Sequence, residues 1–300
     1  MMYTQFFGSY LLNKEYITIN QLIEVLEFQK NVRLKLGVLA INAGYMTADQ
    51  VNKVHRLQAR IDKMFGSIAV EMGYLTDDQV SELLKSQNIG YILLGQALVD
   101  KGYMTNSRFE NAIEEYKKEC KIKDTDFTLT QSEKMLEVIE NFYEFEAFED
   151  AALYTEYISL LFKNLVRFVG DDFIPMKSIT IRDFECKNFT CQRIEGEFSA
   201  YTALEADNNT LIKFASRFSD EEYPELDEYV KASFSEFMNL TNGIFCVNMS
   251  NADRMELDLT PQVFGRDKKI VRMKNAFCIP IKFTFGIINF LIAGNVPTAI

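Results

Sequence analysis

The chain has 300 residues and a formal net charge of −11 at pH 7, with 48% apolar and 25% charged side chains. This composition is typical of a folded globular protein and excludes a fully disordered chain. The acidic excess disfavours sequence-independent binding of DNA or RNA, because phosphate backbones bind to basic surfaces. We therefore expect no nucleic-acid partner.

The reactive side chains indicate a reducing compartment. Five cysteines are scattered along the chain, no CxxC pair occurs, and the single histidine is His55. This pattern predicts neither a metal site nor a disulfide framework, and it favours a cytoplasmic location. The N-terminus lacks the basic start of a signal peptide, and the longest apolar stretch, residues 283–294, is too short to span a bilayer. We expect no membrane insertion.

The distribution of charge divides the chain into three parts. Residues 1–122 carry equal numbers of basic and acidic side chains, whereas residues 124–150 carry nine acidic and one basic. We predict a first domain at 1–122, an acidic connector at 123–150 and a second domain at 151–300. The connector combines a loop with a helix, since Met135, Val138, Ile139, Phe142 and Tyr143 recur at helical spacing. Its charge is interpreted as a solubilising surface rather than a docking site.

The first domain is a sequence repeat of 29 residues in four copies. Positions occupied by the same residue type one period apart include Gly8, Gly37, Gly66 and Gly95, then Tyr16, Tyr45, Tyr74 and Tyr103, then Thr18, Thr47, Thr76 and Thr105. Gly44, Gly73 and Gly102 also repeat, with Glu15 in the first copy. The repeat predicts a stack of small helical units, each too small to bury a core alone.

Each unit reads as two short helices joined by a turn. Gly44 closes the first helix in a left-handed conformation, and Thr47 with Gln50 forms a capping box at the start of the second. The fourth copy departs from the box, because Thr105 is followed by Arg108. His55 occupies an apolar repeat position, so we expect it to pack inside the unit.

This unit resembles the MshEN domain, the nucleotide-binding N-terminal domain of type II secretion and pilus ATPases. The pattern RLGxxLxxxGxxxxxxLxxxLxxQ is matched by Gly37, Gly44, Val51 and Gln58, and again one period later. The resemblance implies cyclic di-GMP as a ligand. The family's first arginine is Lys35 here and Met64 in the next copy, and neither residue replaces its planar fork. We therefore favour a structural or partner-docking module, with cyclic di-GMP binding as the alternative.

The second domain predicts an α+β fold. Helical spacing runs over residues 151–168, 209–218 and 226–242, and the last of these helices is followed by Gly243. Strand patterns occupy residues 178–182, 191–203, 255–260, 277–285 and 287–293. Helices and strands grouped in runs, without βαβ alternation, favour an antiparallel sheet with long helices.

The helix predicted at 226–242 has two distinct faces. Val230, Phe234, Phe237 and Thr241 share one direction and should be buried. On roughly the opposite side a stripe of small and polar residues follows the spacing i, i+4, i+7 and i+11, namely Ala232, Glu236, Asn239 and Gly243. Its small ends let another protein approach the backbone, and its middle presents a carboxylate next to a carboxamide.

This arrangement resembles the CheC/CheX/FliY family of chemotaxis phosphatases. Their signature is Glu-x2-Asn on a helix, followed some twenty residues later by a proline that begins a glycine-containing loop. Here Glu236 and Asn239 are followed by Pro261, 22 positions after the asparagine, and by Gly265. The single motif on a helix favours the CheX-like arrangement, although Ala232 stands where the signature has Ser or Asp. A second match, Glu205 to Asn208, is interpreted as turn chemistry.

The resemblance implies a phosphatase of a phosphorylated CheY-like response regulator. Asn239 would orient the attacking water, Glu236 would pair with a lysine of the receiver, and Ala232, Gly243 and Pro261 would lie at the partner interface. It also implies a dimer built through sheet edges, no cofactor of its own, and a Mg²⁺ ion held by the receiver. Motifs for P-loops, dinucleotide folds, nucleophile elbows and zinc proteases are missing from the sequence. The alternative function is a non-catalytic adaptor that binds a receiver or cyclic di-GMP.

Overall fold

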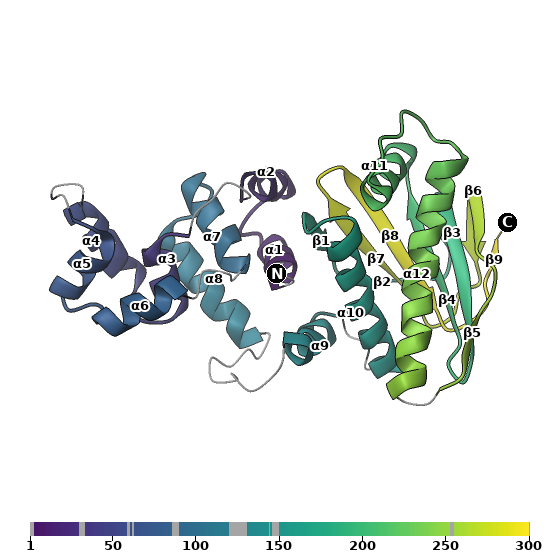
Figure 1. Cartoon of the computed structure of the whole chain (residues 1–300), viewed down its shortest axis with the longest axis horizontal. Helices are drawn as coiled ribbons and strands as arrows, with labels where there is room; N and C mark the ends of the chain where they lie inside the picture. The colour runs from purple at the N-terminus through teal and green to yellow at the C-terminus, as the bar shows by residue number, and fades with distance from the viewer. Residues whose placement is uncertain are drawn as a thin grey trace. The chain divides into compact units, whose positions relative to one another are not determined.

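The computed structural model describes most of the chain, and it divides the chain into two compact units (Figure 1). The units are Met1–Lys134 and Met135–Ile300, so their boundary falls inside the predicted connector. The predicted α+β class is confirmed, with helices in the first unit and an antiparallel sheet in the second. The described residues are 3–29, 34–58, 61, 63–85, 90–119, 131–143, 145, 150–252 and 255–299. The connector residues 123–130 lie outside them.

The described part of the first unit consists of short helices whose starts repeat with the sequence period. Ile19, Ala48, Asp77 and Asn106 each begin the second helix of a copy, and they lie 29 positions apart. The helices are α1 (Tyr3–Asn13), α2 (Ile19–Gln29), α3 (Leu36–Asn42), α4 (Ala48–Gln58), α5 (Phe65–Glu71), α6 (Asp77–Lys85), α7 (Gly90–Asp100) and α8 (Asn106–Glu119).

The turns between paired helices adopt the expected left-handed conformation. Gly44 has φ +69°, and Gly73 and Gly102 are within a few degrees of it. Glu15, which replaces glycine in the first copy, has φ 56°. The first copy therefore keeps the same turn with a side chain that this conformation disfavours.

Capping boxes start the second helices, as the sequence predicts. The Gln50 backbone N–H donates to the Thr47 hydroxyl at 3.3 Å, and the Thr47 N–H donates to the Gln50 carboxamide oxygen at 2.8 Å. Thr18 with Gln21 and Thr76 with Gln79 repeat both bonds. In the fourth copy the Arg108 N–H donates to Thr105.

The four copies pack mainly in nested pairs, the first with the fourth and the second with the third. The main contacts of α1 and α2 are with α7, whereas α3 and α4 pack against α5 and α6 and also contact α7 and α8. Tyr103 and Lys101 of the last copy donate to Glu24 of the first, and Tyr45 of the second donates to Glu82 of the third. Nesting lets the first and fourth copies bury their apolar faces against each other, although they are not neighbours in sequence.

The expectation that His55 packs inside the unit is wrong. Its side chain is exposed on α4, where its ring lies 5.0 Å from the ring of Phe65. Val51 and Val54 fill the buried face of the same helix. Because these valines face the core, His55 points to the surface. The repeat position that was expected to be buried is therefore exposed in this copy.

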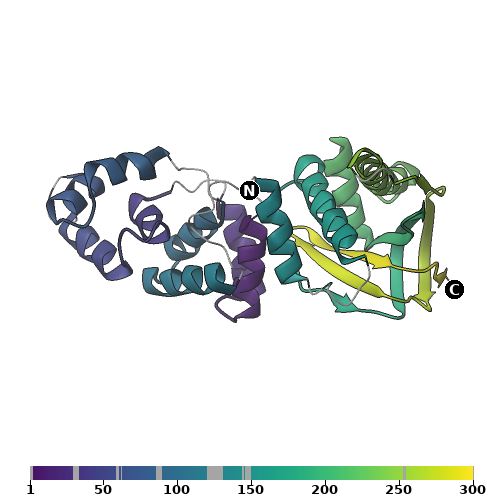
Figure 2. The same cartoon turned by 90° about the horizontal axis from the view of Figure 1, so that it is seen from below.

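The second unit places helices on one face of a curved antiparallel sheet (Figure 2). Its helices are α9 (Gln131–Phe142, which begins in the first unit's range), α10 (Ala151–Phe168), α11 (Asn208–Ser219) and α12 (Glu228–Ala252). The described strands are β1 (Phe173–Pro175), β2 (Ile179–Thr180), β3 (Phe184–Gly196), β4 (Ala200–Ala206), β5 (Leu257–Leu259), β6 (Val263–Val271), β7 (Ala276–Phe283), β8 (Gly286–Ala293) and β9 (Thr298–Ala299). The sheet order is β1-β7-β8-β4-β3-β6-β9, with β2 paired to β7 and β5 to β3.

Aromatic side chains fill the layer between helices and sheet. Phe214 of α11 meets Phe234 and Phe237 of α12 edge-on, with ring centroids 5.3 and 5.1 Å apart. On α10, Tyr157 stacks on Phe290 of β8. These fully buried rings lock the helices on the sheet and fix the rotation of α12 about its axis.

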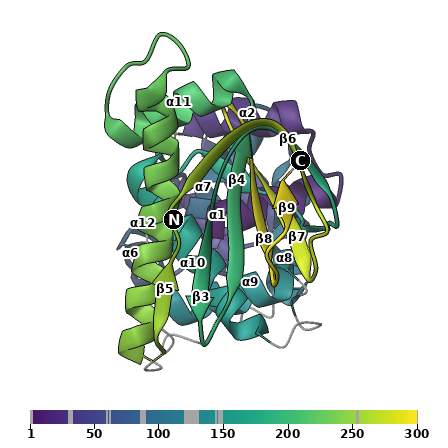
Figure 3. The same ribbon diagram turned by 90° about the vertical axis from the view of Figure 1, so that its right-hand side faces the viewer.

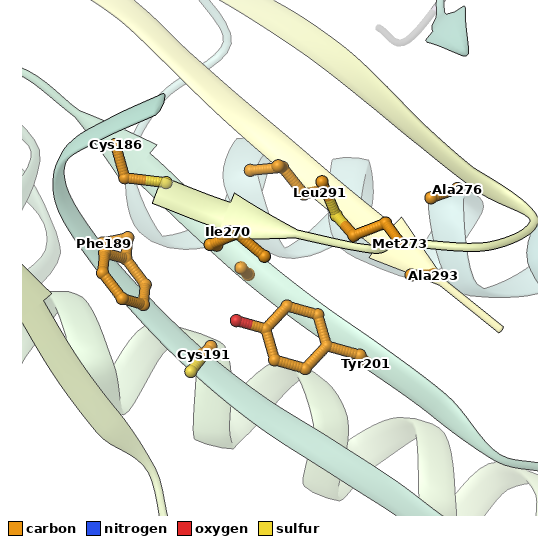
Figure 4. Packing of buried hydrophobic residues seen from close by; sticks show 10 residues of the cluster. Cys186, Phe189, Cys191, Tyr201, Ile270, Met273, Ala276, Leu291 and Ala293 are labelled. Atoms are coloured by element: carbon orange, nitrogen blue, oxygen red, sulfur yellow. The ribbon is translucent and has the colours of Figure 1, made fainter. Parts of the chain in front are cut away.

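A second buried cluster lies on the other face of the sheet (Figure 4). Leu291 belongs to it, and its neighbour Phe290 faces the helices, as expected from the alternation of side chains along a strand. Ile270 of β6 and Met273 close over this face. The remaining members are Cys186, Phe189, Cys191, Tyr201, Ala203, Ala276 and Ala293. The part of the sheet that these residues occupy is therefore buried on both sides.

Helix α12 continues beyond the predicted end at residue 242. It runs through Gly243 to Ala252 without a break. A glycine inside a helix costs roughly 1 kcal/mol relative to alanine. Here the side chains of Phe245 and Met249 are buried after the glycine, and this burial stabilises the continuation of the helix.

The loop predicted after Pro261 is largely a strand. Residues Val263–Val271 form β6, which pairs with β3, and Gly265 sits opposite Phe189. A Cβ atom at Gly265 would lie 2.5 Å from the Phe189 ring, so the glycine allows close packing rather than a turn. The pairing lapses at Asp267, where φ is 49°. The charged residues around Asp267 hid the strand pattern from sequence reasoning.

Candidate functional site

The site is built on helix α12, whose buried face is the predicted one. Val230, Phe234, Phe237 and Thr241 are all fully buried. Phe234 and Phe237 pack against α11, and Thr241 accepts a hydrogen bond from Asn164 of α10 at 3.1 Å. With this face fixed, the opposite face is turned away from the core.

The predicted stripe occupies that outward face. Ala232 and Glu236 are exposed, and Asn239 and Gly243 are half-buried. Among the described residues, and apart from the neighbouring turns of α12 itself, no heavy atom lies within 4 Å of the position that a Cβ at Gly243 would take. The stripe thus presents two polar side chains between two small residues, on a helix face that another protein can approach.

Glu236 and Asn239 lie side by side within this stripe. The Asn239 Nδ2 donates to the Glu236 Oε2 at 3.5 Å. Gln262, next to Pro261 in the following loop, donates its Nε2 to the same carboxylate oxygen at 3.4 Å. Both bonds are long and exposed, so Glu236 can exchange them for a stronger cationic partner.

The loop before β6 is fastened beside the helix (Figure 3). Strand β5 pairs with the end of β3 and packs against α12. Thr260 then binds Arg193 twice, because its N–H donates to the Arg193 carbonyl at 3.1 Å and its hydroxyl accepts from the Arg193 N–H at 3.0 Å. Pro261 follows at an exposed position. The structure thereby brings Pro261 and Gln262 next to the stripe.

A buried carboxamide lies directly beneath Asn239. Gln192 of β3 is 3% exposed, and its Nε2 donates to the Asn239 Oδ1 at 2.9 Å. The same Nε2 donates to the Thr260 carbonyl, also at 2.9 Å. Sequence reasoning missed Gln192 and Gln262. The signal for Gln192 was a polar residue at a core-facing strand position, between Thr190 and Ile194.

Exposed apolar side chains flank the stripe. Tyr229 is 73% exposed near the start of α12, Val247 is 59% exposed past Gly243, and Val263 is 56% exposed at the start of β6. Lys231 pairs with Glu228 at 2.6 Å and lies 5.9 Å from the ring centre of Phe264. An open face with apolar residues around a polar centre suits a protein partner better than a small molecule.

The second Glu-x2-Asn match is structural. Glu205 is buried and accepts from the Lys187 N–H at 3.1 Å and from Asn289 at 2.7 Å. Asp207 caps α11 by accepting from the Thr210 N–H at 2.8 Å. Asn208 accepts from Asn188. These contacts agree with the interpretation of this segment as turn and cap chemistry.

The rest of the described structure offers few other sites. Across the described ranges, no group of three or more His, Cys, Asp or Glu side chains is placed to hold a metal ion. No helix in these same ranges is both long and apolar enough to cross a bilayer. A cavity of about 190 Å³ lies between the β3–β4 hairpin and the end of β8, and the predicted site residues do not line it.

Comparisons with known proteins find solved structures that are similar over about half of the chain. No family model and no curated protein matches the chain. A CheC-like superfamily protein from Shewanella sp. PV-4 is similar in structure at 14% identity, over 47% of this chain and 96% of that chain, with a TM-score of 0.42. The chemotaxis protein CheX from Desulfovibrio desulfuricans is similar at 13% identity, over 48% and 99% of the two chains, with a TM-score of 0.42.

A third similar structure is a complex. It is the CheX–CheY–BeF₃–Mg²⁺ complex from Borrelia burgdorferi, at 19% identity, over 47% of this chain and 96% of that chain, with a TM-score of 0.39. The similarity to CheX and CheC-like proteins that the sequence predicts is thus found over about 47% of this chain. The similarity of the first unit to the secretion-ATPase domain stays a prediction, as do the dimer and the cytoplasmic location.

Proposed function

We propose that the second unit binds a phosphorylated CheY-like receiver domain and accelerates hydrolysis of its aspartyl phosphate. The observation that carries this proposal is the pairing of Asn239 and Glu236 on the outward face of α12, 3.5 Å apart. A receiver brings its own phosphoryl group and its own Mg²⁺. The helper therefore needs no nucleophile and no metal, only groups that position water and partner.

Asn239 is the residue that orients the water. A carboxamide can donate and accept a hydrogen bond without adding negative charge next to a phosphoryl group. The positioned water attacks phosphorus in line with the bond to the aspartate oxygen. That bond breaks, inorganic phosphate leaves, and the receiver's carboxylate is regenerated after the water gives up its proton.

Glu236 is the anchoring residue. Its carboxylate is exposed, and it is held in place by the long bonds from Asn239 and Gln262. A lysine of the receiver would form a shorter, charge-assisted bond to it. Ala232, Gly243 and Pro261 provide the small and rigid contacts around this pair, with the exposed Tyr229 and Val263 at the rim.

The test measures phosphate release from a receiver domain that has been phosphorylated with acetyl phosphate in Mg²⁺. We expect Asn239→Ala to lower the stimulated rate by roughly 100-fold or more while receiver binding persists. Asn248→Ala is the matched control, because Asn248 is an exposed amide on the same helix. It should leave the rate unchanged.

The adaptor function is the competing outcome of the same experiment. If the wild-type chain binds the receiver and leaves its dephosphorylation rate unchanged, the chain is an adaptor. Equal stimulated rates for wild type and Asn239→Ala would remove Asn239 from the mechanism. Glu236→Gln separates the two roles, since it should weaken receiver binding more than it slows the bound complex.

A further inference from the structure

Gln192 is an unusual residue for its place in the sheet. It lies on β3 with its side chain toward α12, and it is 3% exposed. Buried amides are costly unless each polar atom has a partner. Gln192 satisfies this condition with three neighbours, and one of them is the candidate catalytic residue Asn239.

The orientation of the Gln192 carboxamide follows from a neighbour whose chemistry is unambiguous. The Thr260 carbonyl oxygen can only accept, and the Gln192 terminal group lies 2.9 Å from it. The atom of Gln192 that faces Thr260 must therefore be its nitrogen. The same nitrogen lies 2.9 Å from Asn239, so Asn239 must meet it with its oxygen.

The other side of Gln192 is fixed in the same way. Its Oε1 accepts from the Asn242 Nδ2 at 2.9 Å, and the Asn242 Oδ1 accepts from the Tyr157 hydroxyl at 2.5 Å. Burial raises the pKa of Tyr157, which keeps this phenol protonated and able to donate. Thr202 accepts a second bond from Asn242 at 3.0 Å. The buried chain Tyr157–Asn242–Gln192 therefore has one consistent set of donors and acceptors.

This chain determines how Asn239 faces the solvent. With its Oδ1 held by Gln192, the Asn239 Nδ2 points outward, where it contacts Glu236. A flipped Asn239 would bring its own NH₂ against the NH₂ of Gln192, and two donors would face each other. Gln192 also holds the Thr260 carbonyl, so a single side chain links the helix face to the loop that carries Pro261.

We propose that Gln192 is a positioning residue for the phosphatase site, and this inference rests on the proposed function. Gln192 is buried beneath Asn239, so it acts on the site through that residue. It fixes the flip and rotamer of Asn239 and keeps the Thr260–Pro261 loop beside it. The orienting amide is thereby set before a receiver arrives, which is the condition under which positioning lowers a barrier.

The first test compares Gln192→Met with Thr190→Val in the full chain. Thr190 is fully buried on β3, two residues before Gln192, and within the described structure its hydroxyl has no hydrogen-bond partner. With acetyl-phosphate-labelled receiver and Mg²⁺, Gln192→Met should lower the maximal stimulated rate roughly 10- to 100-fold, with receiver binding unchanged within about twofold. Thr190→Val should retain the wild-type rate.

The second test needs no phosphatase activity. Side-chain amide NMR signals of Asn239, assigned by their loss in Asn239→Ala, should show an ordered NH₂ group that exchanges with water. Gln192→Met should make this group as mobile as that of the exposed Asn248. Gln192→Glu replaces the donor by an acceptor, so Asn239 should flip, and its NH₂ group should become protected from exchange.

The outcomes separate this inference from the proposed function. Wild-type inactivity toward receivers would reject the proposed function, and Asn239 order in the NMR test would still decide the role of Gln192. An active wild type with an equally active Gln192→Met would overturn the positioning role. An unchanged Asn239 signal in Gln192→Met would overturn it as well. If Gln192→Glu does not fold, Gln192→Met remains decisive.

Discussion

The two units use polar side chains in opposite ways. In the helical unit the bonds that set each helix start join residues three apart, as between Thr47 and Gln50, and they lie at the surface. In the sheet unit the bonds that set the site join residues far apart in sequence, as between Gln192 and Asn239, and Gln192 is buried. Local surface bonds repeat with the sequence, whereas buried long-range bonds require the whole fold.

The two units also differ in how much each polar contact contributes to stability. The long-range ion pairs of the helical unit, such as Lys14 with Glu119, are exposed and therefore contribute little to its stability. In the sheet unit, removing one member of the buried amide chain leaves a polar partner unsatisfied in the core. Polar substitutions should therefore cost more within the buried amide chain of the second unit than at the exposed ion pairs of the first.

The largest expected effect comes from the aromatic layer of the sheet unit. Phe214→Ala should cost about 3–5 kcal/mol, because it leaves a cavity among Phe234, Phe237 and Phe283. Urea unfolding followed by hydrogen exchange of the sheet amides measures this loss. Lys213→Ala, at the exposed neighbouring position, is the control and should be neutral within about 0.5 kcal/mol.

Alkaline pH should act on the sheet unit through its buried thiols. Burial raises the pKa of Cys186 and of Cys278 to about 12, whereas a thiol in the unfolded chain titrates near 8.5. Because the folded-state pKa is raised, the contribution of these two thiols to the free energy of unfolding is fully present below about pH 8.5. It is lost as the pH rises toward 12. We expect a loss of roughly 1.4 kcal/mol per pH unit and per thiol in this window.

Urea midpoints for unfolding of the sheet unit at pH 8 and pH 10 provide the measurement. The double variant Cys186→Ala/Cys278→Ala should have a flatter pH profile. Cys246→Ala, which removes a thiol with pKa raised to about 11, should flatten it less. A profile that keeps its slope in the double variant would contradict the assignment to these thiols.

A smaller effect is expected from the local caps of the helical unit. Thr47→Ala should lower its stability by about 1 kcal/mol, because the Gln50 N–H loses its acceptor at the start of α4. Thr47→Ser keeps the hydroxyl and should be nearly neutral. Hydrogen exchange at the first turn of α4 is the sensitive readout, and equal protection in Thr47→Ala and wild type would speak against the cap.

The smallest expected effect is a gain. Glu15 holds φ 56° in the turn where the other copies have glycine, so Glu15→Gly should stabilise the unit by about 0.5–1 kcal/mol. Gly44→Ala, at the matching position with φ +69° and space around the Cβ, should destabilise by a similar amount. Thermal unfolding gives the change in melting temperature for each variant. Changes of the same sign in both variants would refute the strain argument.

These contrasts explain what the sequence could predict. Helix starts and turns in the first unit depend on residues three to seven apart, so the 29-residue period and the capping pattern locate them. The nested pairing of copies was not accessible, because each copy offers nearly the same apolar face and the sequence does not say which copy it meets. Helix capping depends on nearby residues, whereas the packing of one copy against another depends on residues far apart in the chain.

For the candidate site, too, the sequence could predict the local arrangement but not the long-range contacts. Helical spacing alone placed Glu236 and Asn239 on one face of α12, opposite Phe234 and Phe237. The sequence shows Gln192 as a polar residue at a core-facing strand position, but it does not show the contact with Asn239, because that contact depends on β3 crossing beneath α12. The strand β6 was hidden by the charges near Asp267, since a strand whose side chains are mostly exposed need not show an apolar run.

The nested pairing of the first unit has a consequence for how the protein is made. The main partner of α1 and α2 is α7, which the ribosome adds long after them. At about 5–20 residues per second, the two leading helices wait for several seconds with their apolar sides uncovered. Nascent chains in this interval are natural clients for chaperones, and synthesis speed through the middle copies sets how long that exposure lasts.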